Sequence, residues 1–325
     1  MNGRLQLRSA TLNCPGRRLL NYNPLTAGMR GSVLLMIFLP ILSIAAASQK
    51  SAQRATTLGA WSIRWQPVQI VNGAPVLFQV KPPTRLKNLS GNWLWHDVLF
   101  TWDPANKIWY GLAGTSLETK PGTYSLTLVA ESEQGKPLSY LKKVLVGAAK
   151  YRMVRLVVPA RYTEPNSTQM QEINQDKALK DKVLLQSASE REWSGRFLPP
   201  VRARVSDVFG TRRQFNGAVQ SVHQGLDYRV PAGTPVSAVN SGIVILAGPL
   251  FYEGKCVVLD HGLGLLTLYL HLSEIKVKEG DRVTRGQQIG LSGATGRATG
   301  AHLHIAVRWQ GAYLNPSTLF ALRFR

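Results

Sequence analysis

Histidines and one carboxylate stand at spacings that could hold a metal ion. Side chains alternate between the two faces of a strand, so His302 and His304 point the same way if that segment is extended. His223 and Asp227 are four residues apart, which places both on one face of an extended or a helical segment. Three ligands drawn from histidine and aspartate, with a fourth position left to water, are typical of a catalytic zinc site. The pattern therefore predicts a zinc hydrolase.

The motif H-E-x-x-H, whose glutamate is the general base of many zinc proteases, does not occur in the chain. Another residue must accept the proton of the attacking water. Zinc lowers the pKa of a bound water from about 15.7 to about 7, so a histidine is a sufficient base.

Three longer motifs surround these residues: His223-Gln224-Gly225-Leu226-Asp227, Leu268-Tyr269-Leu270-His271-Leu272 and Thr295-Gly296-Arg297-Ala298-Thr299-Gly300-Ala301-His302-Leu303-His304. Over about residues 196–320 the chain resembles the LytM/lysostaphin-like zinc metallopeptidases, which cleave peptidoglycan cross-bridges. The resemblance implies that His223, Asp227 and His304 bind Zn2+ and that His271 and His302 are catalytic. One of the two would take the water proton and the other would stabilise the oxyanion, and the sequence leaves open which does which.

The function implied by the resemblance is that of an exported zinc metalloendopeptidase hydrolysing the peptide cross-links of peptidoglycan. The alternative is a non-catalytic relative that binds the cell wall or activates a separate amidase. Retention of all five site residues favours the enzyme. The sequence does not distinguish a cross-link between D-alanine and a diamino acid from a glycine bridge.

A short apolar run near the start predicts export. Met29 and Arg30 precede an apolar run from Val33 to Ile44, which is followed by three alanines and Ser48. This order is typical of a secretory signal peptide over residues 1–47, with Met29 as the expected true start. The run is shorter than the roughly 20 residues that span a bilayer, so no stable transmembrane span is expected after cleavage; an uncleaved anchor is the alternative. The predicted location is the periplasm or cell envelope.

The formal net charge is +21. A basic protein is attracted to polyanions such as nucleic acid, anionic lipid or a cell wall that carries carboxylates and phosphates. Lysine and arginine do not form runs interleaved with aromatic residues, and the export signal argues against a nucleic-acid partner. Peptidoglycan is the expected partner.

The composition and patterning predict a mainly β chain in two domains. Residues 58–149 contain short aromatic and β-branched runs separated by turn residues, a pattern typical of an immunoglobulin-like β-sandwich. One run is read as a single strand from Trp93 to Phe100. Six of the eight tryptophans lie in this region, and we interpret them as core residues; the alternative is a surface that stacks on sugar rings.

Residues 150–195 predict a strand and a helical connector, with helical spacing from about Ser167 to Trp193 and a cap at Asn166 or Ser167. Residues 196–325 predict an antiparallel β peptidase domain of the LytM type. The sandwich could position the catalytic groove against the wall, or could lie across it in an autoinhibitory contact; we favour positioning or regulation over independent catalysis.

Several residues receive individual predictions. We expect Cys256, the one cysteine left after signal cleavage, to be a small core or edge residue. His96 is expected to be structural or exposed, and His261 to be a turn residue or one that orients a neighbour. Tyr269 is expected to share a face with His271 and could donate to the oxyanion, with a core role as the alternative. Arg297 is available for a substrate carboxylate.

Overall fold

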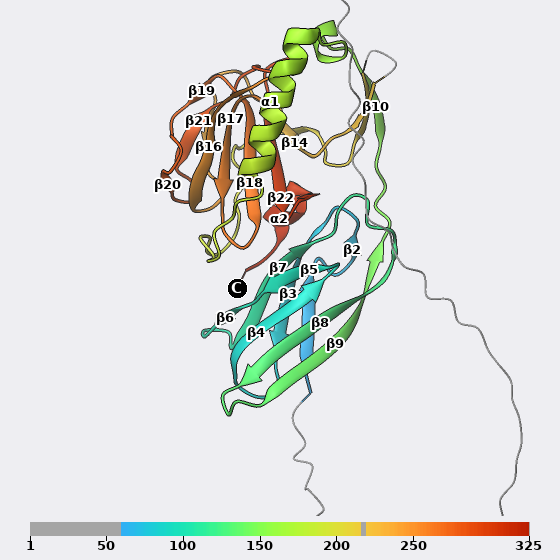
Figure 1. Cartoon of the computed structure of the whole chain (residues 1–325), viewed down its shortest axis with the longest axis vertical. Coiled ribbons are helices and arrows are strands. Elements are labelled where there is room, and N and C mark those ends of the chain that lie inside the picture. The colour runs from blue at the N-terminus through green and yellow to red at the C-terminus, as the bar shows by residue number, and fades with distance from the viewer. Residues whose placement is uncertain (1–59, 216–218, 325) are drawn as a thin grey trace, which may run out of the picture. The chain divides into compact units, whose positions relative to one another are not determined.

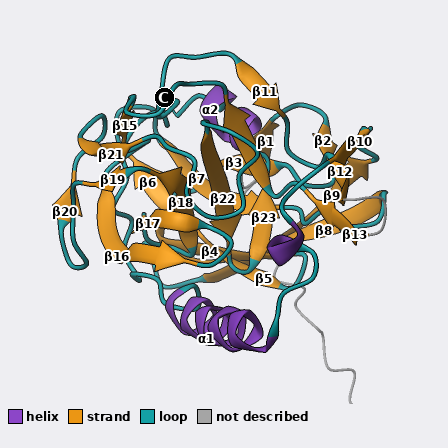
Figure 2. Ribbon diagram, turned by 90° about the horizontal axis from the view of Figure 1, so that it is seen from above, coloured by secondary structure: helices purple, strands orange, loops and turns teal. Residues whose placement is uncertain are grey.

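The computed structural model describes residues 60–324, except 216–218. The predicted signal peptide, residues 1–47, and the predicted start at Met29 lie outside these residues. Figure 1 shows the order of the elements along the chain and Figure 2 shows the same chain from above. The described part contains far more strand than helix, so the expected mainly β class is confirmed. None of the helices in the described ranges is long and apolar enough to cross a membrane.

Two sheets form the N-terminal part of the described chain. The first has the order β1-β3-β7-β6 and the second the order β2-β9-β8-β4-β5. The strands are β1 Ser62–Gln66, β2 Ile70–Val71, β3 Pro75–Lys81, β4 Leu86–Trp93, β5 His96–Leu99, β6 Thr101–Asp103, β7 Ile108–Gly114, β8 Gly122–Ser132 and β9 Pro137–Gly147. Long strands such as β8 alternate buried and exposed residues, because one face packs on the core and the other meets solvent. Phe78 from the first sheet meets Trp93 from the second with ring centroids 5.3 Å apart.

The tryptophans of this region divide between core and surface. Trp93 and Trp109 are buried at 0% and 8% exposure, in agreement with the core interpretation. Trp95 and Trp102 are 87% and 42% exposed, so that interpretation is wrong for them. The single strand predicted from Trp93 to Phe100 is also wrong, because the chain reverses at residues 94 and 95 and pairs β4 with β5.

The connector between the N-terminal sheets and the C-terminal region contains β10 Met153–Leu156, a 3-10 turn η1 at Ala160–Tyr162 and the helix α1 Ser167–Val183. The predicted cap at Asn166 is observed, as the start of a capping box with Gln169. The helix ends at Val183, ten residues before the predicted end at Trp193. Val183 is the one buried residue of α1, so little apolar surface holds the helix in place.

The helix α1 lies beside β16 Gly242–Leu250 (Figures 1 and 2), and polar contacts attach it there. The Asp176 carboxylate accepts a hydrogen bond from the backbone N–H of Phe251 at 2.6 Å. Lys180 Nζ lies 2.5 Å from Glu253 Oε1, and both side chains are mostly buried. A weakly amphipathic helix is therefore fixed by an ion pair and a carboxylate to the loop after β16.

The C-terminal region is built on an eight-stranded sheet in which every pair of neighbouring strands is antiparallel, as predicted. Its path is β11-β14-β22-β18-β17-β16-β20, with β23 beside β22. The bounds are β11 Val205–Asp207, β14 Gly225–Tyr228, β17 Gly254–Asp260, β18 Leu265–Leu272, β20 Arg282–Val283, β22 Leu303–Trp309 and β23 Ala312–Leu314.

Two small sheets and a short helix complete this region. One sheet has the order β15-β21-β19 and the other β10-β12-β13, in which β10 of the connector runs parallel to β12. The bounds are β12 Arg212–Phe215, β13 Val219–Val222, β15 Pro235–Ser237, β19 Glu274–Ile275, β21 Gln288–Leu291 and α2 Pro316–Ala321.

Cys256 is 1% exposed, and burial raises the pKa of its thiol to about 12, as expected of a core residue.

The N-terminal sheets and the C-terminal region share contacts at the end of the chain. Asn315 donates its backbone N–H to the Gly73 carbonyl at 2.7 Å, and Gln310 donates its side-chain amide to the Asp97 carbonyl at 2.7 Å. A single cluster of buried apolar residues extends through both regions. Separating the two would expose part of that core.

Candidate zinc and catalytic site

Three predicted ligands meet between β13, β14 and β22. Asp227 on β14 pairs directly with His304 on β22, and His223 lies in the short connection from β13 to β14. His304 Nδ1 and His223 Nε2 lie 2.7 Å and 3.0 Å from Asp227 Oδ1, and the two nitrogens are 3.0 Å apart. All three residues are at most 8% exposed. One ion could therefore contact one atom from each.

Burial by itself raises the pKa of Asp227, but the hydrogen bonds with His223 and His304 outweigh it and hold the pKa well below its usual range. Burial also lowers the pKa of His304 and so favours the neutral, ligating imidazole. An ionised carboxylate and two imidazoles form a donor set that suits Zn2+. Their burial, charge and proximity fit a zinc site better than a set of structural histidines.

His271 reaches the same site because the strand that carries it is irregular. Val257 pairs with Tyr269 and Lys255 with Leu272, so two residues of β18 oppose the single residue Cys256 of β17. His271 has a φ of 63°, in the left-handed region that is uncommon for a residue other than glycine. This β-bulge turns the His271 side chain into the groove, which is a known use of bulges near functional sites.

The predicted shared face of His271 and Tyr269 is therefore wrong. Tyr269 is fully buried in the core, and its hydroxyl accepts a hydrogen bond from the Val239 backbone N–H at 2.9 Å. The strict alternation that the prediction assumed fails at the bulge, so Tyr269 faces away from the groove and has the core role that was the alternative.

His302 and His271 lie side by side, with ring centroids 4.8 Å apart. His271 Nδ1 is 2.8 Å from the Thr295 carbonyl, and His302 Nδ1 is 2.8 Å from the Gly300 carbonyl. A carbonyl only accepts, so each Nδ1 carries a proton, and in the neutral form of either ring Nε2 is the acceptor. His302 Nε2 lies 3.9 Å from Asp227 Oδ1. Burial is the main cause that lowers the pKa of His271 to about 3, and electrostatic interaction with the neighbouring His304 and His302 lowers it further.

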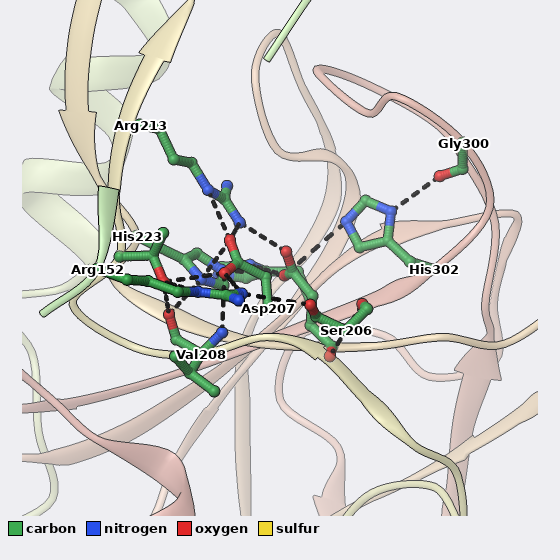
Figure 3. A network of polar contacts seen from close by, with 11 residues as sticks. Arg152, Ser206, Asp207, Val208, Arg213, His223, Gly300 and His302 are labelled. Atoms are coloured by element: carbon green, nitrogen blue, oxygen red, sulfur yellow. Dashed lines mark hydrogen bonds and ion pairs between the residues drawn. The ribbon is translucent and has the colours of Figure 1, made fainter. Parts of the chain in front are cut away.

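Asp207 forms a second set of contacts behind the ligands that sequence reasoning missed. Its Oδ2 is 3.3 Å from His223 Nδ1 and 2.5 Å from Arg213, and its Oδ1 is 2.6 Å from Arg152 (Figure 3). Arg213 also contacts Asp227 Oδ2 at 2.6 Å. Burial by itself raises the pKa of Asp207, but its hydrogen bonds with Arg152 and Arg213 outweigh burial and bring the pKa below its usual range. No local spacing marks these residues, because they come from the connector, β11 and β12.

The five predicted site residues line one groove of about 570 Å³. Connector residues Arg152, Val154, Leu156 and Val158 line it as well, whereas none of its described lining residues belongs to the segment 60–149. Arg297 is also in the lining and stacks over the Tyr252 ring at 4.5 Å, and its contact with a substrate carboxylate stays a prediction. The connector, which was predicted only as a spacer, is part of the groove wall.

The two remaining histidines lie outside the groove lining. His261 is fully buried, with Nδ1 2.7 Å from the Ser241 carbonyl and Nε2 2.8 Å from Thr267 Oγ1. His96 packs its ring against Trp309 with centroids 5.2 Å apart. Both therefore have the structural surroundings that the sequence predicted.

Comparison with known proteins places the C-terminal region in a family. The family model for Peptidase family M23 matches residues 221–316. Peptidoglycan DD-endopeptidase ShyA of Vibrio cholerae is 45% identical over 114 residues, which are 34% of this chain and 26% of that protein. DD-carboxypeptidase/endopeptidase Mpg of Neisseria meningitidis is 41% identical over 118 residues, 36% of this chain and 27% of that protein. The chain thus spans about a quarter of the length of these relatives.

A crystal structure of a peptidase M23 protein from Pseudomonas aeruginosa is also similar, with a TM-score of 0.59 and 28% identity. The match covers 78% of this chain and 96% of that one, which is more than the C-terminal region can supply. Part of the N-terminal architecture therefore recurs in that protein. Residues 221–316 match the model of Peptidase family M23, and the resemblance drawn from the three motifs is confirmed.

Proposed function

We propose that the protein is an exported zinc metalloendopeptidase that hydrolyses peptide cross-links of peptidoglycan. The observation that supports this most directly is the convergence of the His223, Asp227 and His304 donor atoms beside His271 and His302 in one groove. The names of the relatives ShyA and Mpg favour a D,D cross-link over a glycine bridge as the bond that is cut.

In this proposal, His223, Asp227 and His304 hold the metal through one atom each. Bound zinc would supply a Lewis acid that polarises the scissile carbonyl and lowers the pKa of water. His271 and His302 present Nε2 as acceptors toward the groove, so either can take the water proton. The protonated ring then becomes a donor that can stabilise the oxyanion or return the proton to the leaving amine.

The N-terminal sheets, which we interpret as an immunoglobulin-like domain, would position the groove against the cell wall. Their contacts with the C-terminal region run through Asn315 and Gln310, away from the groove lining. This supports positioning over the autoinhibitory contact that the sequence also allowed. We further propose cleavage of the signal after residue 47 and action in the periplasm, which mass spectrometry of the mature chain would test.

Zinc content and digestion of purified sacculi test the enzymatic proposal together. We expect about one zinc per chain and release of peptide-linked fragments whose new ends identify the bond. A stoichiometric zinc protein that releases nothing, but increases digestion by an added amidase, would instead support the non-catalytic activator.

A further inference from the structure

The turn between β4 and β5 has an unusual combination of residues. Trp93 pairs with His96, so Leu94 and Trp95 form a two-residue hairpin turn. Their φ values are 51° and 65°, both in the left-handed region, where such turns strongly prefer asparagine and glycine. A leucine and a tryptophan are thus held in a conformation that disfavours both, and no local folding requirement explains the choice. Backbone strain of this kind is concentrated at functional sites.

The indole of Trp95 is 87% exposed, so burial in the core does not explain the residue either. The neighbouring Trp93 is fully buried and donates Nε1–H to the Gly114 carbonyl at 3.0 Å. The turn therefore places Trp93 in the core and Trp95, two residues later, in solvent. It presents the second one to solvent on a rigid two-residue support.

Trp95 borders a hollow of about 370 Å³ that is separate from the catalytic groove. Its aromatic lining residues are Trp95, His96, Tyr124 and Trp309, and the His96 ring packs against Trp309. The Tyr124 hydroxyl donates to the Lys120 carbonyl at 2.7 Å, which fixes that ring as well. Two of the rings beside Trp95, those of His96 and Tyr124, therefore have contacts that hold them in place before any ligand arrives.

Polar side chains supply the rest of the lining: Ser116, Glu118, Thr119 and Lys120. Glu118 and Lys120 are exposed, and Ser116 and Thr119 contact each other at 3.3 Å between their hydroxyl oxygens. Aromatic rings beside hydroxyl, carboxylate and ammonium groups suit a ligand with one apolar face and a polar circumference. A pyranose ring has this character, with C–H groups on its faces and hydroxyl or acetamido groups at its edge.

We propose that this hollow binds the glycan strand of the cell wall, with a β-1,4-linked N-acetylhexosamine ring stacked on Trp95. The choice of this polysaccharide rests on the proposed function, whereas the site itself rests on the turn and the hollow. Because the hollow includes Trp309 and Ala312 of the peptidase domain, bound glycan would be held next to the domain that cuts the attached peptides. The site would retain the enzyme on the strand without entering the reaction.

The test measures binding of the full mature protein to three probes by calorimetry and tryptophan fluorescence: N-acetylglucosamine tetramer, peptide-free glycan strands and free stem peptides. We expect Trp95→Ala to weaken binding at least about tenfold, the size of a lost aromatic stacking contact. Trp102→Ala is the matched control, because Trp102 is also exposed but packs against Trp109 outside the hollow, with ring centroids 5.6 Å apart.

A second variant separates binding from folding. The double substitution Leu94→Asn, Trp95→Gly supplies the residues that the turn prefers, so we expect a higher unfolding temperature together with lost glycan binding. Both variants should hydrolyse a soluble cross-linked muropeptide at the wild-type rate. A protein that binds neither glycan probe, or whose Trp95→Ala form binds as well as wild type, would overturn the glycan site. Weakened binding to free stem peptides alone would also overturn it, in favour of a peptide surface.

The two proposals fail in different measurements. Glycan binding without hydrolysis of any cross-link would leave the site in place and remove the endopeptidase. Hydrolysis of the soluble muropeptide without glycan binding would support the endopeptidase and remove the glycan site.

Discussion

Gly225 lies directly against the imidazole of His304. A Cβ built on Gly225 would be 2.4 Å from His304 Nε2 and 2.5 Å from the Ile305 carbonyl oxygen. Real Cβ atoms do not approach other atoms this closely, and the carbonyl belongs to the paired strand β22 and cannot move aside. Glycine at this position is therefore required for the third ligand to sit where it does.

Gly225→Ala should displace His304 and lower zinc affinity at least about tenfold, the scale seen when the support of a metal ligand is removed. Competition with a chromogenic chelator measures the affinity. Gly248→Ala is the control, because a Cβ there has no atom within 4 Å and its affinity should match wild type. Equal affinities for the two variants would show that His304 does not bind the metal.

His271→Ala should lower kcat at least about 100-fold while the zinc content stays at one per chain, because His271 accepts a proton and is not a ligand in our assignment. Cleavage of a soluble muropeptide and metal analysis of the same sample measure the two quantities. His304→Ala provides the contrast, since it should lose the metal together with the activity. An active His271→Ala enzyme would refute the assigned role.

Asp207→Asn should weaken zinc binding by about 10- to 100-fold, because the carboxylate near His223 Nδ1 orients that ring and increases its basicity. Asp181→Asn changes an exposed carboxylate that pairs with Lys177 on α1, and it should leave the affinity unchanged. If Asp207→Asn binds zinc as wild type does, the Val208 carbonyl, 3.0 Å from the same nitrogen, is sufficient to orient His223.

Lys180→Met should lower the free energy of unfolding by about 1–3 kcal/mol, because it leaves the mostly buried Glu253 carboxylate without its partner. Lys177→Met, one turn earlier on α1, removes an exposed pair with Asp181 and should change stability by no more than about 0.5 kcal/mol. Urea unfolding curves measure both. Similar losses in the two variants would mean that the Lys180–Glu253 pair does not anchor the helix.

His261 predicts a pH dependence of stability. Complete burial lowers its pKa to about 4, whereas an unfolded histidine has a pKa of about 6.5. Between these values the unfolded chain binds a proton that the folded chain does not. The free energy of unfolding therefore falls as the pH drops below about 6.5, by up to about 3 kcal/mol near pH 4, and this contribution is constant above pH 7.

Urea unfolding of wild type and His261→Gln at pH 7.5 and pH 4.5 measures that effect. The loss of stability between the two pH values should be about 2–3 kcal/mol smaller in the variant, whatever its stability at pH 7.5. Equal losses in the two proteins would show that His261 is protonated in the folded state.

The local spacing of His302 and His304, and of His223 and Asp227, pointed to candidate metal donors from the sequence alone, and the family resemblance implied which three of them would be the ligands. Side-chain direction along a strand follows from the backbone, so residues two apart share a face wherever the strand lies. Local helix-start signals likewise gave the cap of α1 at Asn166. These features depend on neighbours in the sequence, and a single chain is enough to predict them.

The sequence could not give what depends on how distant segments pair. The bulge in β18 exists only in register with β17, and it sends His271 to the groove and Tyr269 to the core. Asp207 reaches His223 because β11 and β14 are neighbours in one sheet, a contact that no spacing encodes. Leu94 and Trp95 have neither glycine nor asparagine to mark a turn, so only the pairing of β4 with β5 reveals it. Residue types and their spacing can be read from a short stretch of sequence. Strand register depends on how all the apolar residues are buried together, and only the tertiary structure shows this.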